Sequence, residues 1–194
     1  MNDIEQRLSL LAERCRTIYN SIGHSSGRPY AYFTYPPEEE RRMRVLADEY
    51  LRDNEVVRYH HIDLVHICVQ ALEGQEEQRA EMLNDPARNA RAKEDIARKW
   101  ARAIRKEIVR LLREATKPGK PVVVLRGLVA LHPITNPTAI MEALAEQEPR
   151  DPATDQIVPI IVLVPGTRPA QTSRVYRFLG LENLTLSFYR GEED

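Results

Sequence analysis

The sequence predicts an α/β fold in which a mainly parallel sheet of about five strands is flanked by helices. Two apolar runs carry most of this prediction, GKPVVVLRGLVAL at 119–131 and IVPIIVLVPG at 157–166. Such runs are typical of parallel strands that are covered on both faces. Strand patterns alternate with helical ones, which implies right-handed crossovers. With 194 residues, 42% of them hydrophobic, the chain can bury one sizeable core, so we expect a single domain over 1–194.

A helix and a strand begin the chain. Five apolar residues at helical spacing predict an amphipathic helix that ends before Gly23; they are Ile4, Leu8, Leu11, Cys15 and Ile18. The aromatic run RPYAYFTYPP at 28–37 predicts a strand, which ends where two prolines cannot donate to a ladder. Those prolines can begin a helix that runs to about Asp53, because Glu38–Glu40 then lie at the positive end of its dipole.

The middle of the chain predicts a strand and two helices. EVVRYHHIDL at 55–64 is strand-like, and LVHICVQALEG at 64–74 is a short apolar helix that Gly74 ends. Asp85 and Pro86 supply an N-cap and a first-turn proline, so they predict the start of a long helix that reaches about Thr116.

The last third of the chain predicts two helices and a final strand. Asn136 and Pro137 predict the start of a helix through about Glu146. We expect Pro165 and Gly166 to form the turn that ends the apolar strand before them. A helix near 171–179 and a strand over LTLSFYR at 184–190 complete the expected elements.

Composition excludes several classes of protein. No apolar run approaches the roughly 20 residues of a membrane helix, and the acidic start MNDIEQRLSL does not resemble a secretory signal. We therefore expect a cytoplasmic protein that does not enter a membrane. Cys15 and Cys68 lie in apolar patterns without CxxC spacing, which favours two buried reduced thiols over a disulfide or a zinc site.

The carboxyl ends of the parallel strands are where a ligand would bind in such a sheet. A phosphate site there needs glycines and usually a lysine, but the first strand is followed by Tyr-Pro-Pro-Glu-Glu-Glu. Proline removes backbone donors and the glutamates repel phosphate. Gly119 and Lys120 precede a strand and lack the upstream glycine of a P-loop. We expect neither nucleotide nor another cofactor here.

Two further groups of residues at this edge could form sites. Of the cluster His60, His61, Asp63 and His66, only His61 and Asp63 can converge, because neighbouring strand residues point to opposite faces. Asp63 as a helix cap explains the cluster better than a metal does. His132 could act as a general base, but no turn exposes a nucleophile among Thr135, Thr167 and Ser173. The sequence therefore predicts no catalytic residue and no metal ligand.

A basic stripe on the long helix is the strongest surface pattern. Residues 85–120 carry 12 basic and five acidic side chains, whereas residues 1–84 carry 10 and 15. Cations spaced three or four residues apart form one face; they are Lys99, Arg102, Lys106, Arg110, Arg113 and Lys117. An apolar stripe lies opposite, at Ile96, Trp100, Ile104, Ile108, Leu111 and Ala115. We expect few acidic neighbours to neutralise the cations, so the stripe is either a solvated face or a contact for a partner.

Several stretches, taken in order over residues 28–190, resemble one family. They are PYAYFTYPPEEERRMRVLADEYL, VRYHHIDLVHICVQALE, VVVLRGLVALHPI and PIIVLVPGTRPAQTSRVYRFL. They are similar to the BrxB family of the bacterial BREX phage-exclusion systems, formerly a domain of unknown function. The family favours an Asp-Gly pair after its Pro-Gly; this chain has Pro169 and Ala170, so any role of that aspartate is lost here. The resemblance implies a reduced relative of P-loop ATPase domains that lacks Walker A.

Three functions follow as hypotheses. The resemblance implies a non-catalytic accessory protein of an anti-phage complex, which contains a methyltransferase, a large ATPase and a PglZ protein of the alkaline-phosphatase type. We expect contact with the PglZ-like component, and the exposed Arg168, Gln171 and Arg174 after Pro-Gly are candidate contacts. The second hypothesis is a DNA-binding subunit that uses the basic stripe. The third is an orphan nucleotide or phosphate enzyme with its ligand at the strand ends.

Overall fold

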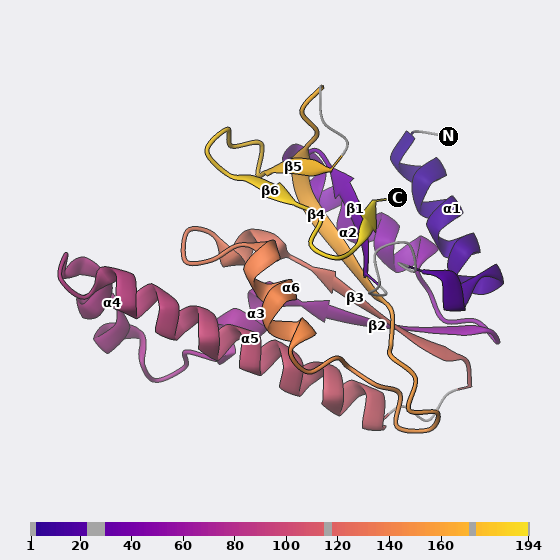
Figure 1. Ribbon diagram of the computed structural model, residues 1–194, viewed down its shortest axis with the longest axis horizontal. Coiled ribbons are helices and arrows are strands. Elements are labelled where there is room, and N and C mark those ends of the chain that lie inside the picture. Colours follow the sequence, from indigo (N-terminus) through magenta and orange to yellow (C-terminus); the bar gives the residue numbers. More distant parts are fainter. Residues whose placement is uncertain (1–2, 23–29, 115–117, 171–173, 194) are drawn as a thin grey trace.

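The centre of the molecule is a sheet of strands in the order β2-β3-β4-β1-β7 (Figure 1). The computed structural model describes residues 3–22, 30–114, 118–170 and 174–193. The strands are β1 (Tyr30–Tyr35), β2 (Val57–Asp63), β3 (Lys120–Arg126), β4 (Ile160–Thr167) and β7 (Glu192–Glu193). All neighbours in this order are parallel. The predicted α/β class with a mainly parallel sheet is therefore confirmed.

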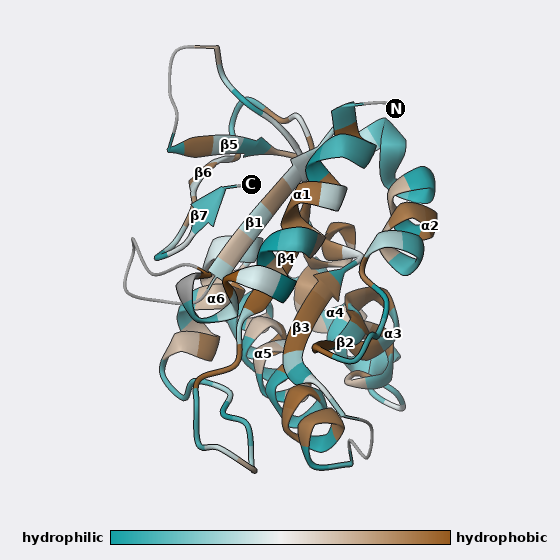
Figure 2. Cartoon of the chain, turned by 90° about the vertical axis from the view of Figure 1, so that its right-hand side faces the viewer, coloured by the Kyte–Doolittle hydropathy of each residue, from teal (hydrophilic) through white to brown (hydrophobic). Residues whose placement is uncertain are grey.

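Helices cover both faces of the sheet, and alternate strand residues serve the two cores. Tyr30 and Tyr32 of β1 belong to one core, whereas Ala31, Phe33 and Tyr35 belong to the other. Helices α1 (Asp3–Thr17) and α2 (Glu40–Tyr50) cover the second core. The first core lies under α3 (Leu64–Gln70), α5 (Asn89–Glu114) and α6 (Pro137–Ala145) (Figure 2). Short 3-10 turns are η1 (Tyr19–Ser21), η3 (Pro37–Glu39) and η4 (Leu128–Leu131).

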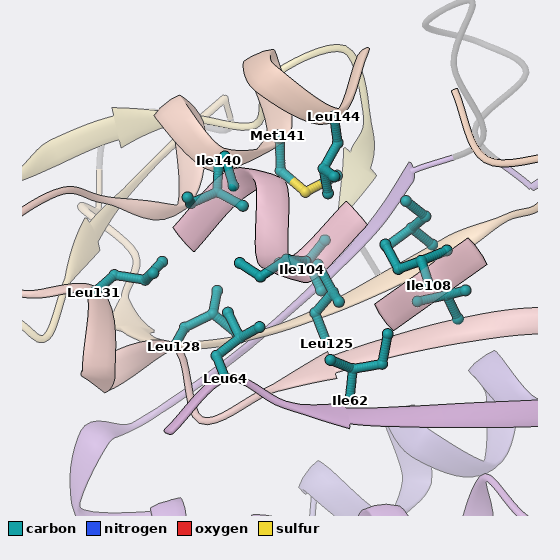
Figure 3. Packing of buried hydrophobic residues seen from close by; sticks show 14 of the residues in the cluster. Ile62, Leu64, Ile104, Ile108, Leu125, Leu128, Leu131, Ile140, Met141 and Leu144 are labelled. Atoms are coloured by element: carbon teal, nitrogen blue, oxygen red, sulfur yellow. The ribbon is translucent and has the colours of Figure 1, made fainter. Parts of the chain in front are cut away.

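The larger core holds α5 against the sheet (Figure 3). Its aliphatic side chains come from the sheet, from α5 and from α6; they include Ile62, Leu125, Ile104, Ile108, Met141 and Leu144. Burying one such side chain contributes on the order of 2 kcal/mol to the free energy of unfolding. Trp100 adds a directional contact, because its Nε1–H donates to the carbonyl of Cys68 at 3.0 Å. The orientation of α5 is therefore set on one side, and its opposite side faces solvent.

A β-hairpin stands where the sequence predicts a helix. Strands β5 (Val175–Phe178) and β6 (Thr185–Ser187) are antiparallel, and β5 also pairs with the end of β4. The helix expected near 171–179 is wrong within 174–179, and residues 171–173 lie outside the described part. The physical reason is period-two burial, since Tyr176 and Phe178 are buried while their neighbours are partly exposed. The ring of Tyr176 lies 5.1 Å from that of Phe188, centroid to centroid.

The expected Pro-Gly turn is also wrong. Pro165 and Gly166 are residues of β4, and Gly166 pairs with Phe178 of β5. A Cβ on Gly166 would lie 2.7 Å from the carbonyl oxygen of Arg177. The glycine therefore permits β5 to approach, and β4 continues to Thr167 as an arm that carries the hairpin.

One helix was not predicted, and several helix boundaries differ from expectation. Helix α4 (Glu76–Asn84) was not predicted, because it has no buried residue and so no apolar stripe to detect. Asp85 caps a turn, accepting from the amide of Ala87 at 2.9 Å, and α5 begins only at Asn89. Helix α2 ends at Tyr50 rather than Asp53. Within the described ranges, no helix has the length and apolarity to cross a membrane.

Candidate functional site

The carboxyl edge of the sheet is closed by contacts among its own polar side chains. Arg44 of α2 donates to Asp63 Oδ2 at 2.6 Å through Nη1 and to Glu40 Oε1 at 3.1 Å through Nε. The hydroxyl of Tyr35, at the end of β1, donates to the other oxygen of Glu40. Asp63 also accepts from the amide of Val65 at 3.0 Å, so the predicted helix cap is confirmed. One arginine thus joins the ends of β1 and β2.

Gly127 packs against this network where β3 ends. Its φ is 71°, which lies in the left-handed region that favours glycine. A Cβ there would lie 2.7 Å from Asp63 Oδ1 and 2.9 Å from Arg44 Nη2. The backbone of Gly127 therefore fills the space above the ion pair, and the chain turns directly into η4. The strand predicted to continue through Leu131 ends at Arg126 for this reason.

The histidines do not assemble a metal site in the described part of the chain. His61 donates through Nε2 to the carbonyl of Leu51 at 2.7 Å, and its Nδ1 lies 3.9 Å from Asp48 Oδ1. Asp63 pairs with Arg44 and caps α3, which agrees with the interpretation of Asp63 as a helix cap rather than a metal ligand. Burial lowers the pKa of His61 below its ordinary value. Among the residues described, no three His, Cys, Asp or Glu side chains form a group that could hold a metal ion.

The solvent side of α5 carries the cations that the sequence singled out, but they fall into two groups. Arg102, Lys106 and Arg113 are exposed, and none forms an ion pair with another residue that the structure describes. Lys99 is half-buried and its Nζ donates to Gln75. Arg110 lies between Glu107, at 2.6 Å, and Glu114, so the expectation of unneutralised charge is wrong at this position. Lys117 lies outside the described residues.

Arg91 extends the free cations toward the start of α5, and the sequence prediction missed it. It is exposed, lacks an ion pair within the described ranges, and precedes Arg102 by 11 residues. Eleven residues are close to three helical turns, so the two side chains share a face. Arg113 follows Arg102 at the same spacing. We call Arg91, Arg102, Lys106 and Arg113 the α5 basic row; at 1.5 Å per residue it extends over about 33 Å.

The apolar side of α5 matches its prediction except at the end. Leu112 is buried, whereas Leu111 is only partly buried, and Ala115 is outside the described residues. Because 3.6 residues make one turn, a stripe with spacing four drifts around the helix, and the burial moves with it. The basic row and the buried row are therefore on opposite sides in the middle of α5 and lie closer together at its two ends.

The three loop candidates lie in different settings. Arg168 is about half exposed and donates to Glu193 of β7, so it already has a partner within the molecule. Arg174 is exposed, and only its carbonyl has a described partner, the amide of Phe188 at 3.4 Å. Gln171 lies outside the described residues. A partner contact through this loop therefore stays a prediction.

Comparison with family models, with curated proteins and with solved structures finds no match to this chain. The arrangement of charge and hydrogen bonds therefore carries the functional argument. The polar side chains at the carboxyl edge of the sheet bind one another, whereas the cations of the α5 basic row are exposed to solvent.

Proposed function

We propose that the protein is a non-catalytic accessory component of a bacterial BREX anti-phage complex, and that the α5 basic row binds another component, the PglZ-like one. The ordered sequence resemblance supports the first half of this proposal. The α5 basic row supports the second, and it is the single observation that carries the interaction role. Four cations lie on one rigid helix face without acidic partners in the described structure, so their field is available to an acidic surface.

The closed sheet edge adds support. Asp63, Glu40 and Arg44 satisfy one another, and a ligand placed there would have to break contacts at 2.6 and 3.1 Å. The cations of the α5 basic row need no such exchange, because a partner's carboxylates would only replace water. The energetic cost of binding is therefore lower on α5 than at the strand ends.

Co-purification tests this proposal. The tagged chain is expressed with the PglZ-like protein, the methyltransferase and the large ATPase, and the captured partners are identified. Arg102→Glu with Lys106→Glu should abolish capture, because like charges then face the partner. The matched control is Arg41→Glu with Arg52→Glu, which reverses two exposed cations elsewhere and should leave capture intact. Capture of none of the three by the unaltered chain would refute the proposal.

Duplex DNA is the second candidate for the same row. The row is about 33 Å long, and its four cations outnumber Asp95, the acidic residue on this face that pairs with Arg98, so the row suits a phosphate backbone, whose contacts release counterions. Affinity for a DNA duplex should then fall steeply as salt rises, and the double charge reversal should remove the fall together with the binding. If the chain captures a partner protein but does not bind DNA at low salt, the α5 basic row binds protein and the DNA-binding role is refuted.

A further inference from the structure

The outer edge of β1 is occupied by β7, and all six residues of β1 are buried. β1 has six residues, and β7 pairs with two of them, Ala31 opposite Glu192 and Tyr32 opposite Glu193. Figure 1 shows β7 as a short arrow beside β1 at the border of the sheet. Farther along the edge, the carbonyl of Thr34 accepts from Arg7 of α1 at 3.0 Å in place of a strand partner. Another strand could therefore pair with this edge only in place of β7.

Charge holds β7 in place. Glu192 points to the α1 side of the sheet and pairs with Arg14, whereas Glu193 points to the hairpin side and pairs with Arg168. Thr34, the one buried polar residue among those described, donates its hydroxyl to Glu193 as well. The side chain of Glu193 is only 9% exposed. Arg14 and Arg168 therefore bind two successive carboxylates of one strand, one on each side of this edge.

The connection into β7 is tight. Arg190 has a φ of 44°, a value that costs energy for a residue with a Cβ. At the next residue, a Cβ on Gly191 would lie 2.4 Å from the Tyr32 ring. Release of β7 would relieve the backbone strain at Arg190, and it would also expose Arg14 and Arg168. Two paired residues are also too few for a strand that is stable without other contacts.

We propose that the edge of β1 binds an extended acidic segment of a partner protein by strand addition, and that β7 is the built-in occupant which that segment displaces. The recognised feature is a pair of adjacent acidic residues in a strand parallel to β1. Adjacent side chains of a strand point to opposite faces, so the first carboxylate meets Arg14 and the second meets Arg168 and Thr34. This surface is separate from the α5 basic row, and it does not depend on the function proposed for that row.

Peptide binding to the full chain tests the proposal. The probe is a fluorescein-labelled peptide with the sequence YRGEED of residues 189–194. Glu192→Gln with Glu193→Gln in the chain weakens the built-in occupant and keeps its backbone. The peptide should bind this variant at least about tenfold more tightly than it binds the unaltered chain, because the fraction of open edges rises. A peptide with both glutamates replaced by glutamine should bind neither protein.

A second substitution locates the binding. Arg168→Glu in the same variant should lower peptide affinity at least about tenfold, since a repulsion replaces a charge-assisted hydrogen bond. Arg174→Glu is the matched control, an exposed cation of the same loop region, and it should have no effect. Circular dichroism checks that each variant is folded. Equal affinity for the unaltered chain and the double variant, or affinity that ignores Arg168→Glu, would overturn the proposal.

Discussion

The close approach of Gly127 to the Arg44–Asp63 ion pair predicts a measurable loss of stability on Gly127→Ala. Two costs add. The first is backbone strain, because alanine at a φ of 71° costs about 1–2 kcal/mol. The second is displacement, because the new methyl group would lie 2.7 Å from Asp63 Oδ1 and 2.9 Å from Arg44 Nη2, and one of these groups must move.

The displacement cost follows from what Asp63 does. Its carboxylate caps α3 through the amide of Val65, and loss of such a cap costs about 1 kcal/mol. Its partly exposed ion pair with Arg44 adds about 0.2–1 kcal/mol. The expected loss for Gly127→Ala is therefore about 2–4 kcal/mol in the free energy of unfolding. Gly74→Ala is a matched control, since its φ is 75° and no atom lies within 4 Å of the added Cβ.

Urea denaturation of both variants separates the two costs. Gly74→Ala should lose only the backbone part, about 1–2 kcal/mol, and Gly127→Ala should lose at least about 1 kcal/mol more. The m-values should not change, because the surface exposed on unfolding is the same. If the two variants lose the same free energy within about 0.5 kcal/mol, the contact with Asp63 does not stabilise the fold and the reasoning is refuted.

Three further changes test separate contacts. Asn136→Ala removes the cap on the amide of Ala139, so urea denaturation should show a loss of about 1 kcal/mol in the free energy of unfolding. Asn136→Ser keeps a capping oxygen and should retain most of this free energy. Equal losses for the two variants would contradict the capping role. Burial lowers the pKa of His61, so its contribution to stability is complete above pH 6.5 and declines as pH falls below that value; His61→Gln should flatten this part of the pH profile, and an unchanged slope would contradict the assignment. Trp100→Phe leaves the carbonyl of Cys68 without its described donor, so thermal unfolding should show a loss of about 1–3 kcal/mol, whereas a variant of unchanged stability would contradict the assigned role of this hydrogen bond.

The spacing of apolar residues, together with the residues that begin and end helices and strands, was enough to predict most of the sheet. The runs around β3 and β4 are apolar throughout because both faces of these strands are covered, and such composition is visible without any tertiary knowledge. Asn136 and Asp63 were predicted as caps because capping is a local interaction over two or three residues. Local interactions leave local patterns, so these elements could be found from the sequence.

The hairpin shows what local patterns miss. In the segment VYRF every second residue is buried, but Val175 on the other face is apolar too, so these four residues show no clear strand pattern in the sequence. Gly166 was interpreted as a turn because Pro-Gly usually forms one. Its actual role is to admit the carbonyl of Arg177, a residue 11 positions later, and only the packed structure shows this. Tertiary contact determined the conformation at both places.

The charged surfaces, too, include local contacts that the sequence indicates and long-range contacts that it does not. The cations of α5 recur at helical spacing, so the stripe was predictable, and Arg91 could have been added from its spacing of 11 residues before Arg102. Pairing of Arg110 with Glu107 and Glu114 was also local and could have been seen at spacings of three and four. The contact of Arg14 with Glu192 spans 178 residues, and no spacing in the sequence indicates it.

Salt dependence should distinguish the two proposed surfaces, because they differ in what binding does to the number of ion pairs. A partner on the α5 basic row forms ion pairs that the free protein lacks, so its affinity should fall as salt rises. On the edge of β1, an acidic strand replaces β7, and each arginine exchanges one carboxylate for another. The peptide YRGEED should therefore bind the unaltered chain with little dependence on salt, and bind the Glu192→Gln, Glu193→Gln variant with affinity that falls as salt rises. A steep fall with the unaltered chain, removed by Arg102→Glu and Lys106→Glu, would place the peptide on α5 instead.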